Sequence, residues 1–130
     1  MEVKRNKSTD KGIKKVMMSI KYSLAGLKYA YGNERSMYLF TGLAIIPIIL
    51  GLIFGITPYQ WIATLLSLGA ILVIELVNTA IEAVVDMVTI EYNELAKIAK
   101  DCGSAATFVA SIIAVIIALV IFVPRFIALF

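Results

Sequence analysis

The sequence predicts an all-α integral membrane protein with three transmembrane helices and an N-terminal amphipathic surface helix. Of its 130 residues, 61% are hydrophobic and only 16% are charged, and the mean hydropathy is +0.93. Soluble domains carry about 45–50% apolar and about 25% charged residues, and a chain this small has too much surface to hide the excess. Composition therefore excludes a water-soluble core, a disordered chain and a disulfide scaffold.

The first 35 residues hold nine of the twelve Lys and Arg residues against three acids, which is +6, and the rest of the chain sums to −3. We expect a flexible basic N-terminus over residues 1–12 and a surface helix over residues 13–34. Apolar side chains with helical spacing share one face of that helix, and its lysines then lie near anionic headgroups. These apolar residues are Ile13, Val16, Met17, Ile20, Leu24, Leu27 and Tyr31. This segment has no short apolar core followed by a small-residue cleavage site, so we do not expect a cleavable signal peptide.

Three apolar segments follow, and together with the N-terminal segment they make a single membrane domain over residues 1–130. The first, residues 39–56, is uncharged and close to the roughly 20 residues that span a bilayer, and it contains Pro47. The others are residues 61–86 and 105–127, joined by a polar connector over residues 87–104. The positive-inside rule puts the N-terminus and this connector in the cytoplasm. Residues 57–60 then lie on the outer side of the membrane. Arg125 lies at the same side, as a single basic residue that departs from the positive-inside rule.

Small residues recur at intervals of four in two of the segments. The third segment has Ala106, Ala110, Ala114 and Ala118, and the first has Gly51 and Gly55. Such spacing lets membrane helices approach closely. Alanine is also simply common in membrane helices, so both interpretations stay open.

The absence of histidine excludes an imidazole base, a histidine metal ligand and a Ser-His-Asp triad. The single cysteine, Cys102, excludes an internal disulfide, and we expect it to be a small buried packing residue. Catalysis would therefore depend on carboxylates, Lys, Asn, Ser or Tyr.

Four polar residues form a stripe on the second segment: Glu75, Asn78, Glu82 and Asp86. At about 100° per residue they fall within an arc of about 80°. A charged side chain at the centre of a membrane helix costs about 2.5–3.5 kcal/mol. A solvated helix end would explain Asp86, but it does not explain Glu75, which follows a long apolar run. We therefore expect a functional stripe.

Grouped carboxylates suit a general base near neutral pH and a hard divalent cation that also binds phosphates. The connector adds Glu91, Tyr92, Asn93, Glu94, Lys97, Lys100 and Asp101. A lysine near acids and a metal suits a triphosphate site, whereas the alternative is a solvated loop. No P-loop, GxGxxG or protein-kinase motif is present. The residues alone indicate a carboxylate-based membrane protein for transport or lipid chemistry.

Several runs closely resemble the small prokaryotic diacylglycerol kinases. These runs are ELVNTAIEAVVD (75–86), EYNE (91–94), AKDCGSAA (99–106) and YSLAGLK (22–28), with Asn33 and Glu34. The resemblance implies an ATP- and Mg²⁺-dependent lipid kinase of the bacterial inner membrane, which phosphorylates the primary hydroxyl of diacylglycerol to phosphatidic acid. It also implies a homotrimer with shared active sites at the cytoplasmic boundary, and no nucleic-acid partner.

The same resemblance implies roles for individual residues. Glu75 would be the general base, Glu34 and Glu82 would hold Mg²⁺ with the ATP phosphates, and Asn78 and Asp86 would support this group. The residues expected to contact ATP are Lys15, Tyr22, Glu91, Tyr92, Asn93, Lys100 and Asp101. Ser104 would lie near the lipid head. Lys15, expected to touch both ATP and lipid, stands where the family often has arginine, and a lysine lacks the bidentate fork.

Three alternatives stay open. Some family members phosphorylate undecaprenol, and the runs AKIAKD and LAGLKY look more like that branch, whereas GSAA and EAVVD look more like the diacylglycerol branch. A small cation-coupled transporter would use Glu75 as an ion site, although it has no need of a charge-dense connector. A purely structural membrane protein would tolerate Glu75→Gln.

Overall fold

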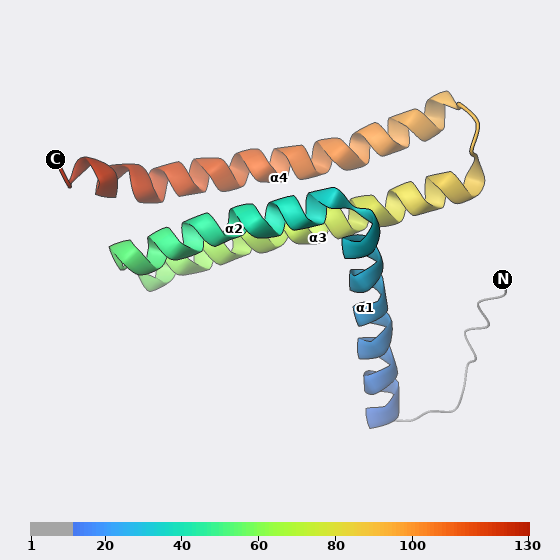
Figure 1. Cartoon of the computed structure of the whole chain (residues 1–130), viewed down its shortest axis with the longest axis horizontal. Coiled ribbons are helices and arrows are strands. Elements are labelled where there is room, and N and C mark those ends of the chain that lie inside the picture. The colour runs from blue at the N-terminus through green and yellow to red at the C-terminus, as the bar shows by residue number, and fades with distance from the viewer. Residues whose placement is uncertain (1–11) are drawn as a thin grey trace.

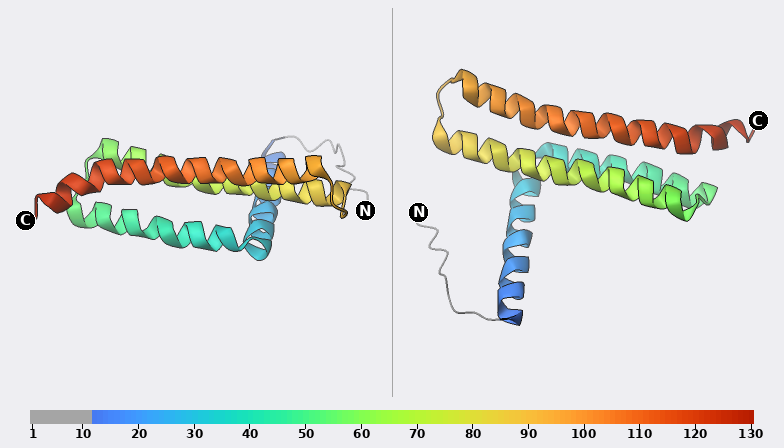
Figure 2. Two further views of the ribbon diagram at one scale, coloured as in Figure 1. Left: turned by 90° about the horizontal axis from the view of Figure 1, so that it is seen from above. Right: turned by 180° about the vertical axis from the view of Figure 1, so that it is seen from behind.

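The computed structural model describes residues 12–130 as four helices. They are α1 (Ile13–Asn33), α2 (Arg35–Phe54), α3 (Pro58–Val88) and α4 (Glu94–Ile127). Helices α2, α3 and α4 run side by side as an antiparallel bundle. Helix α1 projects almost at right angles from the point where α2 begins, and α3 and α4 continue past that point (Figure 1, Figure 2). The basic N-terminus expected over residues 1–12 lies, except for Gly12, outside the described residues.

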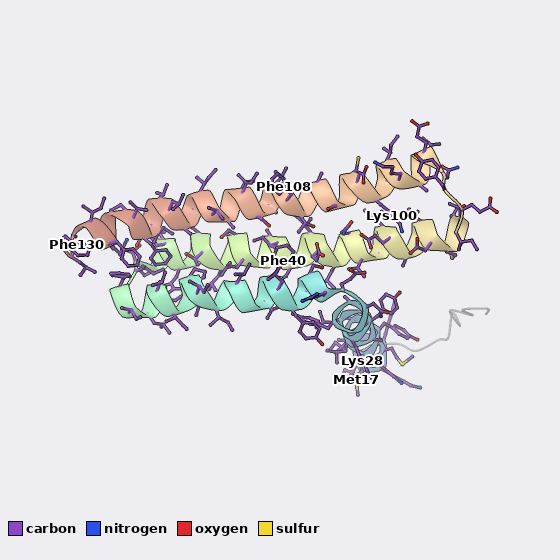
Figure 3. The ribbon with its side chains drawn as sticks, turned by 45° about the horizontal axis from the view of Figure 1, so that its top comes forward. Met17, Lys28, Phe40, Lys100, Phe108 and Phe130 are labelled. Carbon is purple, nitrogen blue, oxygen red and sulfur yellow. The ribbon has the colours of Figure 1, made fainter. Side chains whose placement is uncertain are left out.

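The all-helical class and the three apolar spans are confirmed. Helices α2, α3 and α4 are each long and apolar enough to cross a membrane. Most of their large apolar side chains face away from the bundle; Phe108 is an example on α4 (Figure 3). Such an exterior suits lipid or partner subunits rather than water.

The bend between α1 and α2 is made at Glu34, whose backbone is extended (φ −109°, ψ 112°). Two aromatic side chains secure it, because the rings of Tyr31 and Tyr38 meet edge to face with centroids 5.2 Å apart. The hydroxyls of Tyr31 and Thr41 also lie 2.6 Å apart. The end of α1 is thereby fixed to the start of α2, and Glu34 is held beside the bundle.

The helices extend further into the polar connector than the sequence suggested. Residues 87–104 were expected to be a connector, yet α3 ends at Val88 and α4 begins at Glu94. Asn93 caps α4, since its Oδ1 accepts from the backbone N–H groups of Leu95 (2.9 Å) and Ala96 (3.1 Å). An Asn cap satisfies otherwise unpaired helix donors, so the polar composition of residues 94–104 does not interrupt the helix.

At the opposite end, Thr57 and Gln60 form a capping box that starts α3 after the left-handed turn at Gly55 (φ 59°). Arg125 of α4 donates to Gln60 Oε1 at 2.6 Å and to the carbonyl of Ile121 at 2.7 Å. Arg125, the basic residue that departs from the positive-inside rule, therefore links the start of α3 to the end of α4.

The small residues have separate explanations. Ala110 and Ala114 are buried against Ile71 and allow α3 and α4 to pack closely, whereas Ala106 is exposed. Gly51 packs on Trp61, because a Cβ there would lie 2.8 Å from the indole ring. Since Gly55 ends α2, Gly51 and Gly55 do not form one helix-contact motif.

Candidate functional site

The carboxylate of Glu75 is the buried centre of the site. It lies on α3 with 5% of its surface exposed. Ser36 Oγ, from the first turn of α2, donates to Glu75 Oε1. Thr107 Oγ1, from α4, donates to Glu75 Oε2 at 2.8 Å. Three helices thus converge on one intramembrane acid, which is the residue the stripe singled out.

Glu34 lies close enough to Glu82 and Glu75 for their negative charges to act on it. The pKa of Glu34 is raised above 4.5, first by burial and then by the negative charges of Glu82 and Glu75, while Lys100 opposes the shift. Nearby like charges disfavour ionisation of a carboxyl. The bend after α1 therefore brings Glu34 to the acids of α3, which the sequence separates from it by at least 41 positions.

Asn78 links this group to α4. Its Nδ2 donates to Glu82 Oε1 at 3.2 Å, whereas its Oδ1 is buried and has no partner among the described residues. The backbone of Gly103 lies against this oxygen, since a Cβ at Gly103 would lie 2.1 Å from it. Only glycine at position 103 permits this approach, and the approach fixes the amide that orients Glu82.

A polar pocket of about 300 Å³ lies where α3 turns into α4. Lys100 Nζ pairs with Asp86 Oδ1 across it at 2.6 Å, and Lys97 Nζ pairs with Asp101 Oδ2 at 2.5 Å. Figure 3 shows Lys100 between the two helices. The predicted nucleotide residues that line this pocket are Glu91, Tyr92, Asn93, Lys100 and Asp101.

Other predicted residues are not brought to this group within one chain. Lys15 precedes Glu34 by 19 positions along α1, about 28 Å at 1.5 Å per residue. Tyr22 is exposed farther along the same helix, and Ser104 is exposed on α4. Cys102 is exposed as well, so the expectation of a buried packing residue is wrong. Gly103, not Cys102, occupies the side of α4 that faces Asn78.

The donor set fits a magnesium ion that arrives with a nucleotide. Within residues 12–130 no group of three or more His, Cys, Asp or Glu side chains is arranged to hold a metal. Mg²⁺ is usually held by one or two carboxylates together with water and substrate phosphates. Glu34 and Glu82, whose charges interact, could supply two such carboxylates.

Sequence reasoning missed three residues that shape the site: Ser36, Gly103 and Thr107. Ser36 follows Glu34 by two positions, and Thr107 is a hydroxyl inside an apolar run. Gly103 lies within a quoted motif, yet nothing in its spacing pointed to Asn78. Periodicity along one helix does not reveal which residues of another helix it meets.

Comparison with known proteins covers the predicted site residues from Tyr22 onward. The family "Prokaryotic diacylglycerol kinase" matches residues 21–122. A diacylglycerol kinase of Haemophilus influenzae is 40% identical over 99 residues, which are 76% of this chain and 84% of the relative. A diacylglycerol kinase of Synechocystis is 37% identical over 103 residues, 77% of this chain, and the match spans 58% of that longer relative.

An undecaprenol kinase of Bacillus subtilis is 33% identical over 93 residues, 72% of this chain and 76% of the relative. The family match covers well over half of the chain, and it includes the acidic stripe, the α3–α4 turn and Gly103. The resemblance seen in the sequence motifs is therefore confirmed. The chain belongs to the prokaryotic diacylglycerol kinase family.

Proposed function

We propose that this diacylglycerol kinase transfers the γ-phosphate of ATP to the primary hydroxyl of its lipid, with Glu75 as the general base. The observation that carries the proposal is the buried Glu75 carboxylate, which lies at the meeting point of three helices and whose charge acts on Glu34. A general base must lie within hydrogen-bond reach of the proton it removes. An acid at membrane depth meets this requirement for a lipid hydroxyl, which a water-exposed acid does not.

Glu34 and Glu82 would hold Mg²⁺ together with the ATP phosphates, and the bound ion would neutralise charge on the transferred phosphoryl group. Asn78 orients Glu82 through its amide. Lys100 lies beside this pair and offers its ammonium to the phosphates, while residues 91–93 and Asp101 hold the remainder of the nucleotide. Because phosphoryl transfer is mostly positioning and charge neutralisation, no histidine or cysteine is needed.

The nucleotide side faces the cytoplasm in this proposal. Lysine and arginine are concentrated in the N-terminal segment and in the connector before the last span, which is the cytoplasmic pattern. Helix α1 then lies along the membrane surface, with Lys15 and Tyr22 available to lipid headgroups or to the nucleotide of a neighbouring subunit, and Ser104 available to the lipid head.

We propose further that the enzyme is a homotrimer with shared active sites in a bacterial inner membrane. The spans of a single chain leave most large apolar side chains uncovered. A three-helix subunit also offers little interior to shelter charged residues, and intramembrane charges normally face a bundle interior. Association of subunits would cover the apolar side chains and shelter the charged residues.

Two of the relatives described above are named diacylglycerol kinase, and one is named undecaprenol kinase. The decisive experiment uses purified protein in mixed micelles with Mg²⁺, γ-labelled ATP and each lipid in parallel. Glu75→Gln is the test variant. Glu94→Gln is the matched control, since Glu94 is an exposed acid in the first turn of α4.

We expect labelled phosphatidic acid with wild-type protein and with Glu94→Gln, and a loss of at least a hundredfold with Glu75→Gln. If only undecaprenol is phosphorylated, undecaprenol is the acceptor and the proposed mechanism still holds. Full activity of Glu75→Gln would refute Glu75 as the base. No product from either lipid would refute the proposed reaction.

A further inference from the structure

We infer that Ser36 and Thr107 are positioning residues, whose hydroxyls hold the Glu75 carboxylate from two sides in the orientation that accepts the lipid proton. The inference rests on the proposed role of Glu75. It adds two residues that lie outside the acidic stripe, on α2 and α4, and that no sequence motif brought forward.

The first observation is that each oxygen of Glu75 has its own donor. Oε1 accepts from Ser36 Oγ, and Oε2 accepts from Thr107 Oγ1 at 2.8 Å. Ser36 precedes Glu75 by 39 positions and Thr107 follows it by 32. Two bonds from donors on two other helices prevent the carboxylate from turning about its last torsion, which is otherwise broad.

The second observation is that Thr107 departs from the usual hydrogen bonding of Ser and Thr inside helices. A hydroxyl in a helix commonly donates to the backbone carbonyl four residues before it. Thr41, Thr79 and Ser111 do so here, at 2.7, 3.0 and 2.9 Å. Thr107 donates to Glu75 instead. Ser36, whose fourth preceding residue belongs to α1, also donates to Glu75, so both hydrogen bonds join different helices.

The third observation is the burial of the pair formed by Thr107 and Glu75. Thr107 is 4% exposed and Glu75 is 5% exposed. A buried carboxylate without hydrogen-bond donors is strongly disfavoured, and the two hydroxyls supply such donors. An ionised carboxylate accepts about four hydrogen bonds, so two donors leave room for the hydroxyl of the lipid.

The function that follows is orientation. A reacting group misplaced by about 1 Å can lose about a hundredfold in rate. Ser36 also lies two residues after Glu34, so one short segment at the bend carries both a predicted Mg²⁺ ligand and a donor to the base. Movement of that segment would change the metal site and the base together.

The test compares variants that separate the hydroxyl from packing. Thr107→Val keeps the shape of the side chain and removes the hydroxyl, whereas Thr107→Ser keeps the hydroxyl and removes a methyl. Ser36→Ala removes the other donor. Thr64→Val is the matched control, because Thr64 is a buried threonine of α3 (3% exposed) whose Oγ1 has no partner among the described residues.

We expect Thr107→Val and Ser36→Ala each to lower kcat about tenfold with the KM for lipid unchanged. Thr107→Ser should stay within about twofold of wild type, and Thr64→Val should match wild type. If Thr107→Ser is as impaired as Thr107→Val or more, packing is responsible and the inference fails. Should Thr107→Val not fold, Ser36→Ala decides, and an unchanged kcat there refutes the inference.

Failure of the proposed function gives a different result. If Glu75→Gln keeps its activity, Glu75 is not the base, whatever the threonine variants do. If Glu75→Gln is inactive while Thr107→Val and Ser36→Ala turn over normally, Glu75 remains the base and only the positioning role is refuted.

Discussion

Glu34 shows how the setting of one side chain links its protonation to the proposed metal. It lies at the bend between α1 and α2, where partial burial and the charges of Glu82 and Glu75 raise its pKa above 4.5. Such a carboxyl takes up its proton at a higher pH than an ordinary one. A protonated carboxyl does not bind Mg²⁺, so acidification should release the ion early.

We therefore expect the apparent affinity for Mg²⁺ to fall as pH decreases toward the pKa of Glu34, beginning above the range of an ordinary carboxyl. Glu34→Gln should weaken Mg²⁺ binding at least tenfold at neutral pH. It should also make the remaining affinity less dependent on pH. Mg²⁺ titrations of kinase activity at several pH values would measure both effects, with Glu94→Gln as control. An unchanged Mg²⁺ requirement in Glu34→Gln would contradict the assignment.

The same shift has a consequence for stability in the absence of Mg²⁺. The pKa of Glu34 in the folded protein lies above its ordinary value, so the folded state binds the proton more tightly than the unfolded state does. Linkage then makes Glu34 stabilising at low pH and less favourable as pH rises through that raised pKa. Mg²⁺ opposes this loss, because a ligand that binds only the folded state stabilises it.

At the scale of the elements, the contact between α3 and α4 is the most extensive in the bundle. It depends on small residues, with Ala110 and Ala114 against Ile71 in the middle and Gly103 against Asn78 nearer the polar pocket at the α3–α4 turn. Close packing of this kind leaves no space for an added methyl group. The same contact orients Glu82 through Asn78, so Gly103 affects both the packing of α4 on α3 and the proposed site.

Gly103→Ala should therefore displace the Asn78 amide, destabilise the protein by about 1–3 kcal/mol and lower kinase activity about tenfold or more. The matched control is Gly69→Ala on α3, where a Cβ meets nothing within 4 Å. It should be neutral or stabilising by up to about 1 kcal/mol. Thermal unfolding in detergent and kinase assays would measure both variants. A fully stable and active Gly103→Ala protein would show that α4 can shift without effect on the site.

At the scale of the whole molecule, one chain presents an apolar exterior on three spans, and its amphipathic helix projects from the bundle, contacting α2 and α3. The described chain brings Glu34, Glu75, Glu82 and Lys100 together. Lys15 lies far along α1 from this group, so any contact it makes with ATP would involve a neighbouring subunit.

We expect the active enzyme in mild detergent to have a protein mass of three times 14.2 kDa. Light scattering that separates detergent from protein mass would measure it, with activity assayed on the same fractions. Lys15→Ala should keep the trimer mass and raise the KM for ATP or lipid, because it removes a contact without removing an interface. Full activity in a monomeric fraction would refute the shared site.

Much of this protein follows from its sequence alone. The apolar runs determine three spans, because only a helix satisfies its backbone in lipid, and helical periodicity places Glu75, Asn78, Glu82 and Asp86 in one stripe. The family motifs add the reaction. Helix ends were less predictable, since polar residues after Asn93 continue α4 once that residue caps it.

Only the tertiary structure decided what meets Glu75. The two hydroxyls come from positions 36 and 107, and their approach depends on how α2 and α4 are rotated and shifted against α3. The contact between Gly103 and Asn78, and that between Arg125 and Gln60, arise in the same way. Periodicity records which residues share a face of one helix, whereas the partner of each face is set by side-chain packing between helices that are distant in sequence.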